Sequence, residues 1–206
     1  MKRIALSLLL VIAATCVVSC TKDQPLETVD DICSKMDDEA FKNFCYNEFD
    51  KDGDHKVSME EAARVRELRV NHLNISSLKG IEYFTAITWL VCSENNLTTL
   101  DLSNNKRLNV LYCSTNHLAS LKVSGNTKLE WLDCVDNQLT SLDVSNNTEL
   151  QQLSCTNNQL STLDVSKNTK LIKLLCANNP LTALYLYQGQ TINYFEKPKD
   201  CPIVYK

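Results

Sequence analysis

Four carboxylates stand at regular spacing in one short polar stretch of the chain. They occupy positions one, three, five and twelve of the segment that runs from Asp50 through Asp52 and Asp54 to Glu61, and position eight is the apolar Val57. Oxygen atoms at these positions can converge on one point, which is the donor set that a hard cation requires. Without a cation the four side chains would repel one another, so we interpret the segment as a cation-binding loop.

The spacing of this loop resembles an EF-hand. The resemblance implies bound Ca²⁺ and six ligand residues: the side chains of Asp50, Asp52, Asp54 and Glu61, the carbonyl of Lys56, and Ser58, directly or through water. One residue departs from the family pattern, because His55 stands where the family has a glycine with a left-handed backbone. We expect weakened binding rather than none. The alternative is an acidic loop in which Ser58 and Glu61 only cap the following helix.

A helix is expected on either side of the loop. Apolar residues recur at helical spacing after Asp37, which predicts a first helix. The residues of this apolar stripe are Phe41, Phe44, Cys45 and Phe49. A second helix is expected from Ser58 to about Glu67. By the resemblance, residues 36–67 form an EF-hand helix pair that caps the amino-terminal end of the elements that follow.

A 21-residue repeat occupies most of the remaining chain. Residues 129–149 have the sequence LEWLDCVDNQLTSLDVSNNTE, in which the pattern LxxLxCxxN is followed by LxxLxVxxN. The repeat contains one column of cysteines and two of asparagines: Cys92, Cys113, Cys134, Cys155 and Cys176; Asn95, Asn116, Asn137, Asn158 and Asn179; and Asn105, Asn126, Asn147 and Asn168. A fixed period of this length indicates a stacked solenoid.

The residue types fit two extended segments in each turn. Leu, Cys and Val would point inward from these segments, and each Asn would enter a bend and satisfy its backbone groups. These features resemble the leucine-rich-repeat family, in a short bacterial variant with Cys at a core position, from about Val65 to Thr191. The resemblance implies a curved leucine-rich-repeat solenoid of short parallel strands over residues 68–191. Residues 192–206 are expected to close it as a carboxy-terminal cap strand.

The ten cysteines do not form one disulfide pattern. The five of the repeat column would lie about 4.8 Å apart with parallel Cβ vectors, which is poor disulfide geometry. We therefore expect buried free thiols in this column. Cys33, Cys45 and Cys201 lie outside the repeat, and the sequence is compatible with a Cys33–Cys45 disulfide or with two buried thiols.

The first 19 residues have the composition of a secretory signal peptide. Lys2 and Arg3 precede an apolar run that is shorter than the about 20 residues of a membrane span. The sequence Val-Val-Ser-Cys that ends at Cys20 resembles a bacterial lipobox. That resemblance implies a lipid anchor on Cys20, residues 20–35 as a tether, and an outer-membrane lipoprotein that is a candidate for surface display. An ordinary leader cleaved nearby would keep export without the lipid.

Charge and motif content narrow the function classes. The formal net charge is −4, and an acidic chain without a basic cluster is a poor nucleic-acid binder. No HExxH or GxSxG motif occurs, and the histidines do not pair with Ser or Cys in a nucleophile motif. Many carboxylates outside the loop recur with the repeat, as Asp101, Asp143 and Asp164 do. We therefore predict a non-catalytic protein.

Outward positions of the LxxLxCxxN strand that vary from turn to turn are the candidates for partner binding. The candidate residues are Trp89, Val91, Val110, Tyr112, Trp131, Asp133 and the nearby Asp136. In the leucine-rich-repeat family this surface is concave and commonly binds partners. We expect Trp89, Tyr112 and Trp131 to form one column that binds a protein or peptide with apolar and basic groups. A glycan stacked on the same rings and an inert spacer are the alternatives.

Overall fold

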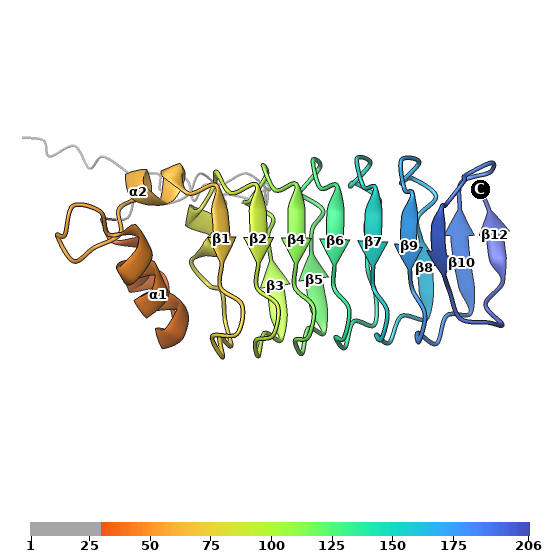
Figure 1. The fold of residues 1–206 in the computed structure, drawn as a ribbon, viewed down its shortest axis with the longest axis horizontal. Helices are drawn as coiled ribbons and strands as arrows, with labels where there is room; N and C mark the ends of the chain where they lie inside the picture. The colour runs from red at the N-terminus through yellow and green to blue at the C-terminus, as the bar shows by residue number, and fades with distance from the viewer. Residues whose placement is uncertain (1–29) are drawn as a thin grey trace, which may run out of the picture.

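A helix pair followed by a coil of short parallel strands makes up residues 30–206, the part of the chain that the computed structural model describes (Figure 1). The predicted signal peptide, Cys20 and residues 20–29 of the predicted tether lie outside the described residues. Each turn of the coil contributes one extended segment to each of two sides. This architecture confirms the predicted solenoid.

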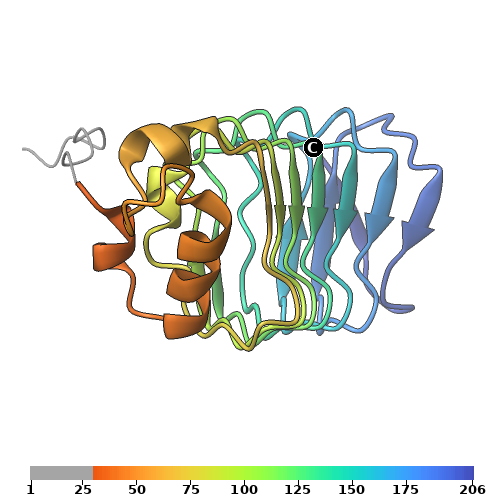
Figure 2. The ribbon, with the colours of Figure 1, turned by 60° about the vertical axis from the view of Figure 1, so that its left-hand side comes forward.

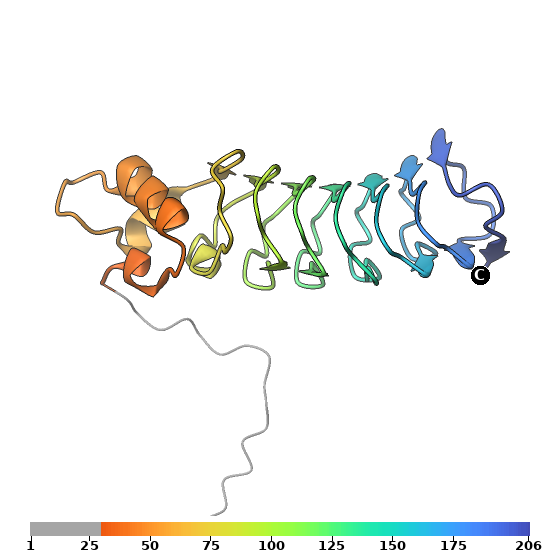
Figure 3. The same cartoon turned by 90° about the horizontal axis from the view of Figure 1, so that it is seen from below.

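Seven strands form a parallel sheet along one side of the coil. Successive strands pair so that Leu68, Leu90 and Leu111 stand side by side. In order along the sheet, the strands are β1 (Glu67–Arg69), β2 (Trp89–Val91), β4 (Val110–Tyr112), β6 (Trp131–Asp133), β7 (Gln152–Ser154), β9 (Lys173–Leu175) and β11 (Tyr194–Glu196). Figure 3 shows this sheet on the inner side of a shallow curve, so its outward residues line the concave face.

The other side of the coil is less continuous. It holds one group of two strands and one of three: β3 (Thr99–Asp101) with β5 (Ser120–Lys122), and β8 (Thr162–Asp164) with β10 (Ala183–Leu186) and β12 (Ile203–Tyr205). Residues 141–144 between these groups repeat the sequence pattern but form no strand. Asp101 of β3 binds Lys122 of β5 at 2.8 Å across the two-stranded group.

An inward column of leucines and cysteines forms a continuous core. The five cysteines of the repeat are fully buried free thiols, as predicted. Burial raises the pKa of Cys92 and of Cys176 to about 12, so both thiols stay protonated at neutral pH. A neutral thiol packs as a small apolar group, and the column therefore adds to the core without a charge to satisfy.

Buried asparagines of the first column join each turn to its neighbours. Nδ2 of Asn116 donates to the carbonyl oxygen of Cys113 in its own turn (3.2 Å) and to that of Cys92 in the preceding turn (3.0 Å). Its Oδ1 accepts a hydrogen bond from the backbone N–H of Leu97 at 3.0 Å. Equivalent bonds are made by Asn95, Asn137, Asn158 and Asn179. Both predicted asparagine columns are structural, because the second column also bonds between turns.

In that second column only the amide nitrogen is used. Nδ2 of Asn126 donates to the carbonyl oxygens of Leu102 (3.1 Å) and Asn105 (2.8 Å), two positions in the preceding turn. The Oδ1 atoms of the column are buried without a hydrogen-bond partner in the described residues: Asn105, Asn126, Asn147 and Asn168. The second asparagine column therefore joins adjacent turns through its Nδ2 donors alone.

A column of residues with a left-handed backbone follows the concave strands. Its φ angles lie between 52° and 56° at Glu94, Thr115, Asp136, Asn157 and Asn178. Asn and Asp tolerate this conformation better than β-branched residues do. Nδ2 of Asn157 donates to Oδ1 of Asp136 at 2.5 Å, and Nδ2 of Asn178 donates to Oδ1 of Asn157 at 2.7 Å. Thr115 is therefore the strained member of the column.

The helix pair lies across the amino-terminal end of the coil (Figure 2). Helix α1 spans Glu39–Phe49 with Asp38 as its N-cap, one residue later than expected. Helix α2 spans Met59–Arg64 and is shorter than expected, because the chain enters β1 at Glu67. Two short 3₁₀ helices flank them in sequence: η1 (Ile32–Lys35) and η2 (Ile81–Tyr83).

Aromatic packing and one buried carboxylate hold the helix pair on the first turn. The ring of Phe84 lies 6.4 Å from that of Phe41 and 5.4 Å from that of Phe49, between ring centroids. Asp38 accepts hydrogen bonds from the backbone N–H of Phe41 (3.0 Å) and of Ser76 (2.7 Å). Burial alone would raise the pKa of Asp38, but these hydrogen bonds outweigh it and lower the pKa from 3.8.

We predict that Thr115→Asn stabilises the coil by about 1 kcal/mol, because it removes a β-branched residue from a left-handed position. The reverse change in an equivalent turn, Asn157→Thr, should destabilise by at least as much, since it also removes two side-chain hydrogen bonds. Urea unfolding of both variants measures the difference. Destabilisation by Thr115→Asn, or no loss of stability with Asn157→Thr, would contradict this explanation.

We predict that Asp38→Asn lowers the free energy of unfolding at pH 7 by about 1–3 kcal/mol, because the carboxylate accepts several buried hydrogen bonds. A carboxylate with a lowered native pKa stabilises the fold above its unfolded pKa, and this contribution is lost as the pH falls through the native pKa. The unfolding curves of wild type and variant should therefore converge in acid, below pH 3.8. The exposed neighbour Asp37→Asn serves as the control, and a constant difference down to the lowest pH would contradict the prediction.

Candidate functional sites

The acidic loop between α1 and α2 brings three of its carboxylates together. Ligand oxygens of Asp50, Asp52 and Asp54 all lie within 4.8 Å of one another, the only such group of possible metal ligands among residues 30–206. The donors are hard oxygens, and the side chains of Asp52 and Asp54 are exposed. This donor set fits Ca²⁺ rather than a metal that prefers sulfur or nitrogen.

The loop backbone is folded around the carboxylate of Asp50. Its Oδ1 accepts a hydrogen bond from the N–H of Gly53 (2.8 Å) and its Oδ2 from the N–H of His55 (3.0 Å). Both residues have a left-handed backbone, with φ of 76° at Gly53 and 65° at His55. His55 thus adopts the conformation for which a glycine is preferred at this position, at a cost of about 1–2 kcal/mol. The departure strains the loop and does not prevent its formation.

Glu61, at loop position twelve, is attached to both ends of the loop. Its Oε1 accepts a hydrogen bond from the N–H of Lys51 (2.8 Å) and its Oε2 from the N–H of Ser58 (2.9 Å). The hydrogen bond from Lys51 is the main cause that lowers the pKa of Glu61. Ser58 and Glu61 also form the expected capping box of α2. At Lys56, the backbone N–H donates to Oδ1 of Asp54 at 2.9 Å.

A segment that the sequence assigned to the tether anchors the loop. Oδ1 of Asp31 accepts a hydrogen bond from the N–H of Val57 (3.1 Å), and the N–H of Ile32 donates to the carbonyl oxygen of Val57 (2.9 Å). The hydroxyl of Tyr46 donates to Oδ2 of Asp31 at 2.6 Å. The predicted tether of residues 20–35 is therefore too long, because Ile32 is fully buried in the cap. The two apolar residues after Asp31, Ile32 and Cys33, were the feature of the sequence that could have indicated a buried segment here.

The two cysteines of the cap are neighbours. Cys33 in η1 and Cys45 in α1 are both fully buried, and both are free thiols in the structure. A hydrogen bond with Cys33, together with burial, raises the pKa of the Cys45 thiol. Of the two alternatives for this pair, the structure contains the buried thiols.

The strand register places the predicted aromatic residues in two columns rather than one. Trp89, Val110 and Trp131 are the first residues of their strands and stand opposite one another. Tyr112 is the third residue of β4, so it stands between Val91 and Asp133 in the neighbouring column. The expected single column of Trp89, Tyr112 and Trp131 is therefore wrong, because two residues along a strand separate its first and third positions.

The aromatic rings of this face pack on one another. The ring centroids of Trp89 and Tyr112 are 5.9 Å apart, and the guanidinium of Arg69 lies 5.9 Å from the centre of the Trp89 ring. Nε1 of Trp89 is buried and has no hydrogen-bond partner within residues 30–206. Trp89, Tyr112 and Trp131 are half-buried and Val110 is buried, so the rings cover the sheet as well as presenting a surface.

The two predicted acidic residues of the face differ in environment. Asp133 is half-buried and its Oδ1 accepts a hydrogen bond from the N–H of Val135 at 3.1 Å. Burial raises the pKa of Asp133 and the nearby carboxylate of Asp136 adds to this rise, whereas the hydrogen bond from Val135 and the nearby ammonium of Lys173 partly oppose it. Asp136 is exposed in the left-handed column and accepts a hydrogen bond from Asn157. Asp133 is therefore a desolvated carboxylate that a cationic partner group would stabilise.

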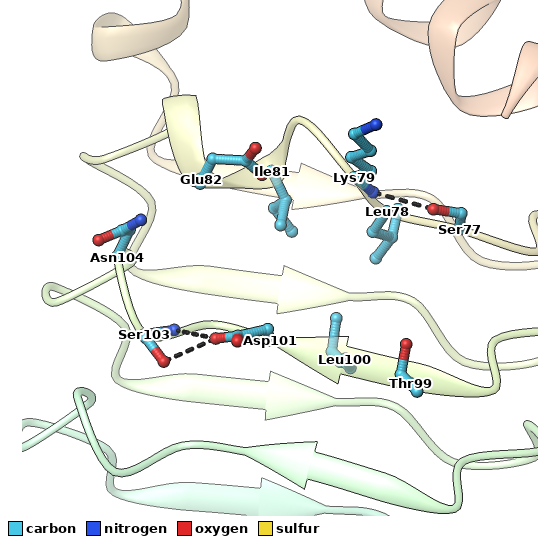
Figure 4. Close-up of a pocket in the computed structure, with 10 residues that line it drawn as sticks. All are labelled: Ser77, Leu78, Lys79, Ile81, Glu82, Thr99, Leu100, Asp101, Ser103 and Asn104. Carbon is cyan, nitrogen blue, oxygen red and sulfur yellow. Dashed lines mark hydrogen bonds between the residues drawn. The ribbon is translucent and has the colours of Figure 1, made fainter. Parts of the chain in front are cut away.

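A cavity of about 510 Å³ lies on the opposite side of the coil, between the first turn and β3 (Figure 4). Lys79, Glu82 and Asp101 are among its lining residues, and no predicted site residue lines it. Asp101 accepts hydrogen bonds from the N–H (3.0 Å) and hydroxyl (2.6 Å) of Ser103 and also binds Lys122. Its carboxylate is already satisfied, so we assign no ligand to this cavity.

Within residues 30–206, no helix has the length and apolar composition to cross a membrane.

Comparison with known proteins identifies the architecture. No model of a known protein family matches the chain. Internalin J of Listeria monocytogenes serotype 4b (strain F2365) is 40% identical over 68 residues, which are 33% of this chain and 7% of internalin J. The structure of the functional domain of InlJ from Listeria monocytogenes is similar with a TM-score of 0.68 at 36% identity, over 77% of this chain and 38% of that chain. The chain has a leucine-rich-repeat fold.

A second leucine-rich-repeat comparison supports the fold alone. The internalin InlF from Listeria monocytogenes str. 4b F2365 is similar with a TM-score of 0.64 at 23% identity, over 87% of this chain and 58% of that chain. The functional domain of InlJ includes a cysteine ladder, and this chain has five buried cysteines in successive leucine-rich repeats. This chain covers 7% of internalin J, 38% of the InlJ structure and 58% of the InlF structure, which is less than two thirds of the length of each.

We predict that Ca²⁺ raises the melting temperature of the protein, because a ligand that binds only the folded state stabilises it. At about 100 times the dissociation constant the gain is about 2.7 kcal/mol, or about 5–10 °C for a chain of this size. Glu61→Gln should abolish most of the shift. Glu60→Gln is the matched control, since Glu60 is exposed, adjacent in sequence and paired with Arg64 outside the ligand set. An equal shift in the Glu61 variant would place the binding elsewhere.

Proposed function

We propose that this chain is a calcium-stabilised, non-catalytic recognition module of the bacterial cell envelope that binds a protein or peptide on its concave face. The observation that carries the proposal is the difference between the repeated and the varied residues. Leu, Cys and Asn recur at fixed positions in the five turns that contain Cys92, Cys113, Cys134, Cys155 and Cys176, and they are buried there. The outward residues of the seven-stranded sheet change from turn to turn, as expected for a surface that fits one particular partner.

A partner with apolar and basic groups fits this face best. Trp89, Tyr112 and Trp131 supply rigid aromatic area, because they are half-buried and mounted on paired strands. Asp133 and Asp136 supply carboxylates beside the rings. Aromatic anchors flanked by charges are typical of protein-binding hot spots, and the desolvated carboxylate of Asp133 favours Lys or Arg in the partner.

Calcium has a structural role in this proposal. The loop residues that would hold it are Asp50, Asp52, Asp54, Lys56, Ser58 and Glu61. The loop connects the two helices that cover the amino-terminal end of the core, and Asp31 and Tyr46 fix it to α1. A cation bound there would neutralise the clustered carboxylates and stabilise the cap.

The cell-envelope location rests on the leader and on the similarity to internalin J. The lipobox-like sequence that ends at Cys20 supports export and a lipid anchor in the outer membrane, which makes the chain a candidate for surface display. Internalin J is itself a bacterial protein. Display on the outer face of that membrane would place the partner on or outside the cell surface.

A glycan is the second candidate ligand, because exposed faces of aromatic rings can stack on sugar rings. Trp89 and Trp131 stand two strands apart, with Val110 between them. That separation, about 9–10 Å by strand spacing, could accommodate successive sugar units. The half-buried state of the rings and the adjacent carboxylates favour the protein partner.

We predict that Trp131→Ala weakens partner binding at least about tenfold, whereas Leu175→Ala on the other half of the same face changes it less than about twofold. The partner is first captured from the native cell surface with the immobilised full chain, and the affinities are then measured by biolayer interferometry. Thermal melting verifies that both variants fold. A captured ligand that resists protease and is destroyed by periodate would support the glycan instead. Equal binding by both folded variants would show that the half of the concave face around Trp131 does not contribute to the binding site.

A further inference from the structure

The two tryptophans of the chain stand on the same concave face but have different surroundings. The guanidinium of Arg69 lies 5.9 Å from the centre of the Trp89 ring and is ion-paired with the carboxylate of Glu67. Trp131 stands two strands further along the sheet. No cationic side chain of residues 30–206 is in contact with its ring. The first tryptophan therefore receives a cation from the chain itself, and the second does not.

The turn that carries Trp131 is acidic. Residues 129–137 contain no cationic residue and three carboxylates: Glu130, Asp133 and Asp136. The equivalent segments of the two neighbouring turns, residues 108–116 and 150–158, contain no charged residue. The carboxylates around Trp131 therefore have no cation beside them on either adjacent turn, and a positive group of a partner would be attracted to this place.

A buried hydroxyl lies beside one of these carboxylates. Ser154 is the strand partner of Asp133, and because it follows the inward Leu153 its side chain points to the concave face. Its exposed fraction is 9%, and no group within residues 30–206 forms a hydrogen bond with its hydroxyl. Buried polar groups of proteins are nearly always hydrogen-bonded. The hydroxyl of Ser154 is therefore a position for a donor from outside the chain.

The spacing of these groups favours a guanidinium over a metal ion or an ammonium. Within residues 30–206, only the acidic loop brings three possible metal ligands within 4.8 Å of one another, so the carboxylates around Trp131 do not converge on one point. Asp133 stands about 6–7 Å along the strand from Trp131 and about 4.8 Å across from Ser154. A guanidinium stacks on an aromatic ring and directs its donors as a planar fork, whereas an ammonium is a compact point charge.

We propose that the partner inserts one arginine side chain at Trp131. This inference rests on the proposed function, because it names the group that the concave face recognises. The guanidinium stacks on the indole ring of Trp131, as that of Arg69 does on Trp89. It donates hydrogen bonds to the carboxylate of Asp133 and to the hydroxyl of Ser154, which supply a charged and a neutral acceptor on adjacent strands.

A titration of the purified full chain with N-acetyl-arginine amide tests this proposal, since that probe carries a guanidinium and no other charge. The two tryptophans give two indole N–H signals in a nitrogen–proton NMR spectrum, and Trp131→Phe assigns them. The Trp131 signal should shift with a dissociation constant on the order of 1–10 mM. The Trp89 signal should move little, because Arg69 already lies over that ring. N-acetyl-lysine amide should bind at least about threefold more weakly, and the uncharged N-acetyl-citrulline amide should not bind.

Variants of the acceptors separate this site from general attraction to an acidic surface. Asp133→Asn should raise the dissociation constant of the arginine amide at least about fivefold. Ser154→Ala should raise it about twofold to fourfold and leave that of the lysine amide unchanged, because only the planar fork reaches both acceptors. Lys173→Gln removes a cation near Asp133 and should tighten binding about twofold. Glu94→Gln, the matched control, removes one charge two turns away and should change binding less than about twofold.

Thermal melting verifies that each variant folds. A Trp131 signal that does not shift up to about 50 mM arginine amide, equal binding of the arginine and lysine amides, or unchanged binding to folded Asp133→Asn would overturn the arginine site. An unshifted signal together with loss of the captured partner in Trp131→Ala would overturn the arginine site and keep the partner-binding proposal. A shifted signal together with equal partner binding by Trp131→Ala and Leu175→Ala would support the arginine site and contradict the partner-binding proposal.

Discussion

The structure depends on hydrogen bonds that buried asparagines make between successive turns. In a coil of this kind, each turn contacts only the turns next to it. The bends of the coil also leave backbone polar groups that water cannot reach. Each Asn of the first column satisfies carbonyl oxygens in two turns and an N–H in a third segment, as Asn116 does. A buried polar group left without a partner costs about 1–3 kcal/mol, so these amides fix both the bend and the spacing of the turns. The leucine and cysteine columns can then pack at constant separation.

Regular stacking turns the concave side into a rigid platform. The repeat pattern does not fix the residue types at the outward positions of this sheet, so the outward side chains differ from turn to turn. The aromatic residues on it also pack against neighbours, as the contact between Trp89 and Tyr112 shows. Preorganised rings lose little conformational entropy when a partner binds, so partial burial is compatible with recognition and supports it.

The two ends of the coil differ in how far other elements cover the hydrophobic core. At the amino-terminal end, Asp38 connects α1 to the first turn through Ser76, and Asp31 connects η1 to the acidic loop through Val57. The cap, the loop and the first turn thus form one hydrogen-bonded unit, and a cation in the loop would act on the stability of the whole end. At the carboxy-terminal end the sheets stop at β11 and β12 with Phe195 exposed.

The sequence by itself determined the period, the inward columns and the acidic loop, because each rests on residue spacing along a short stretch. Cys134 and Asn137 carry the same information as their counterparts one repeat away, so local pattern was enough. The tertiary structure decided what depends on neighbours distant in sequence. It placed Tyr112 beside Asp133 rather than beside Trp131, drew Asp31 from the expected tether into the cap, and left Phe195 uncovered. Register, burial and the state of an end are set by which turns lie side by side, and a single turn's sequence does not contain that information.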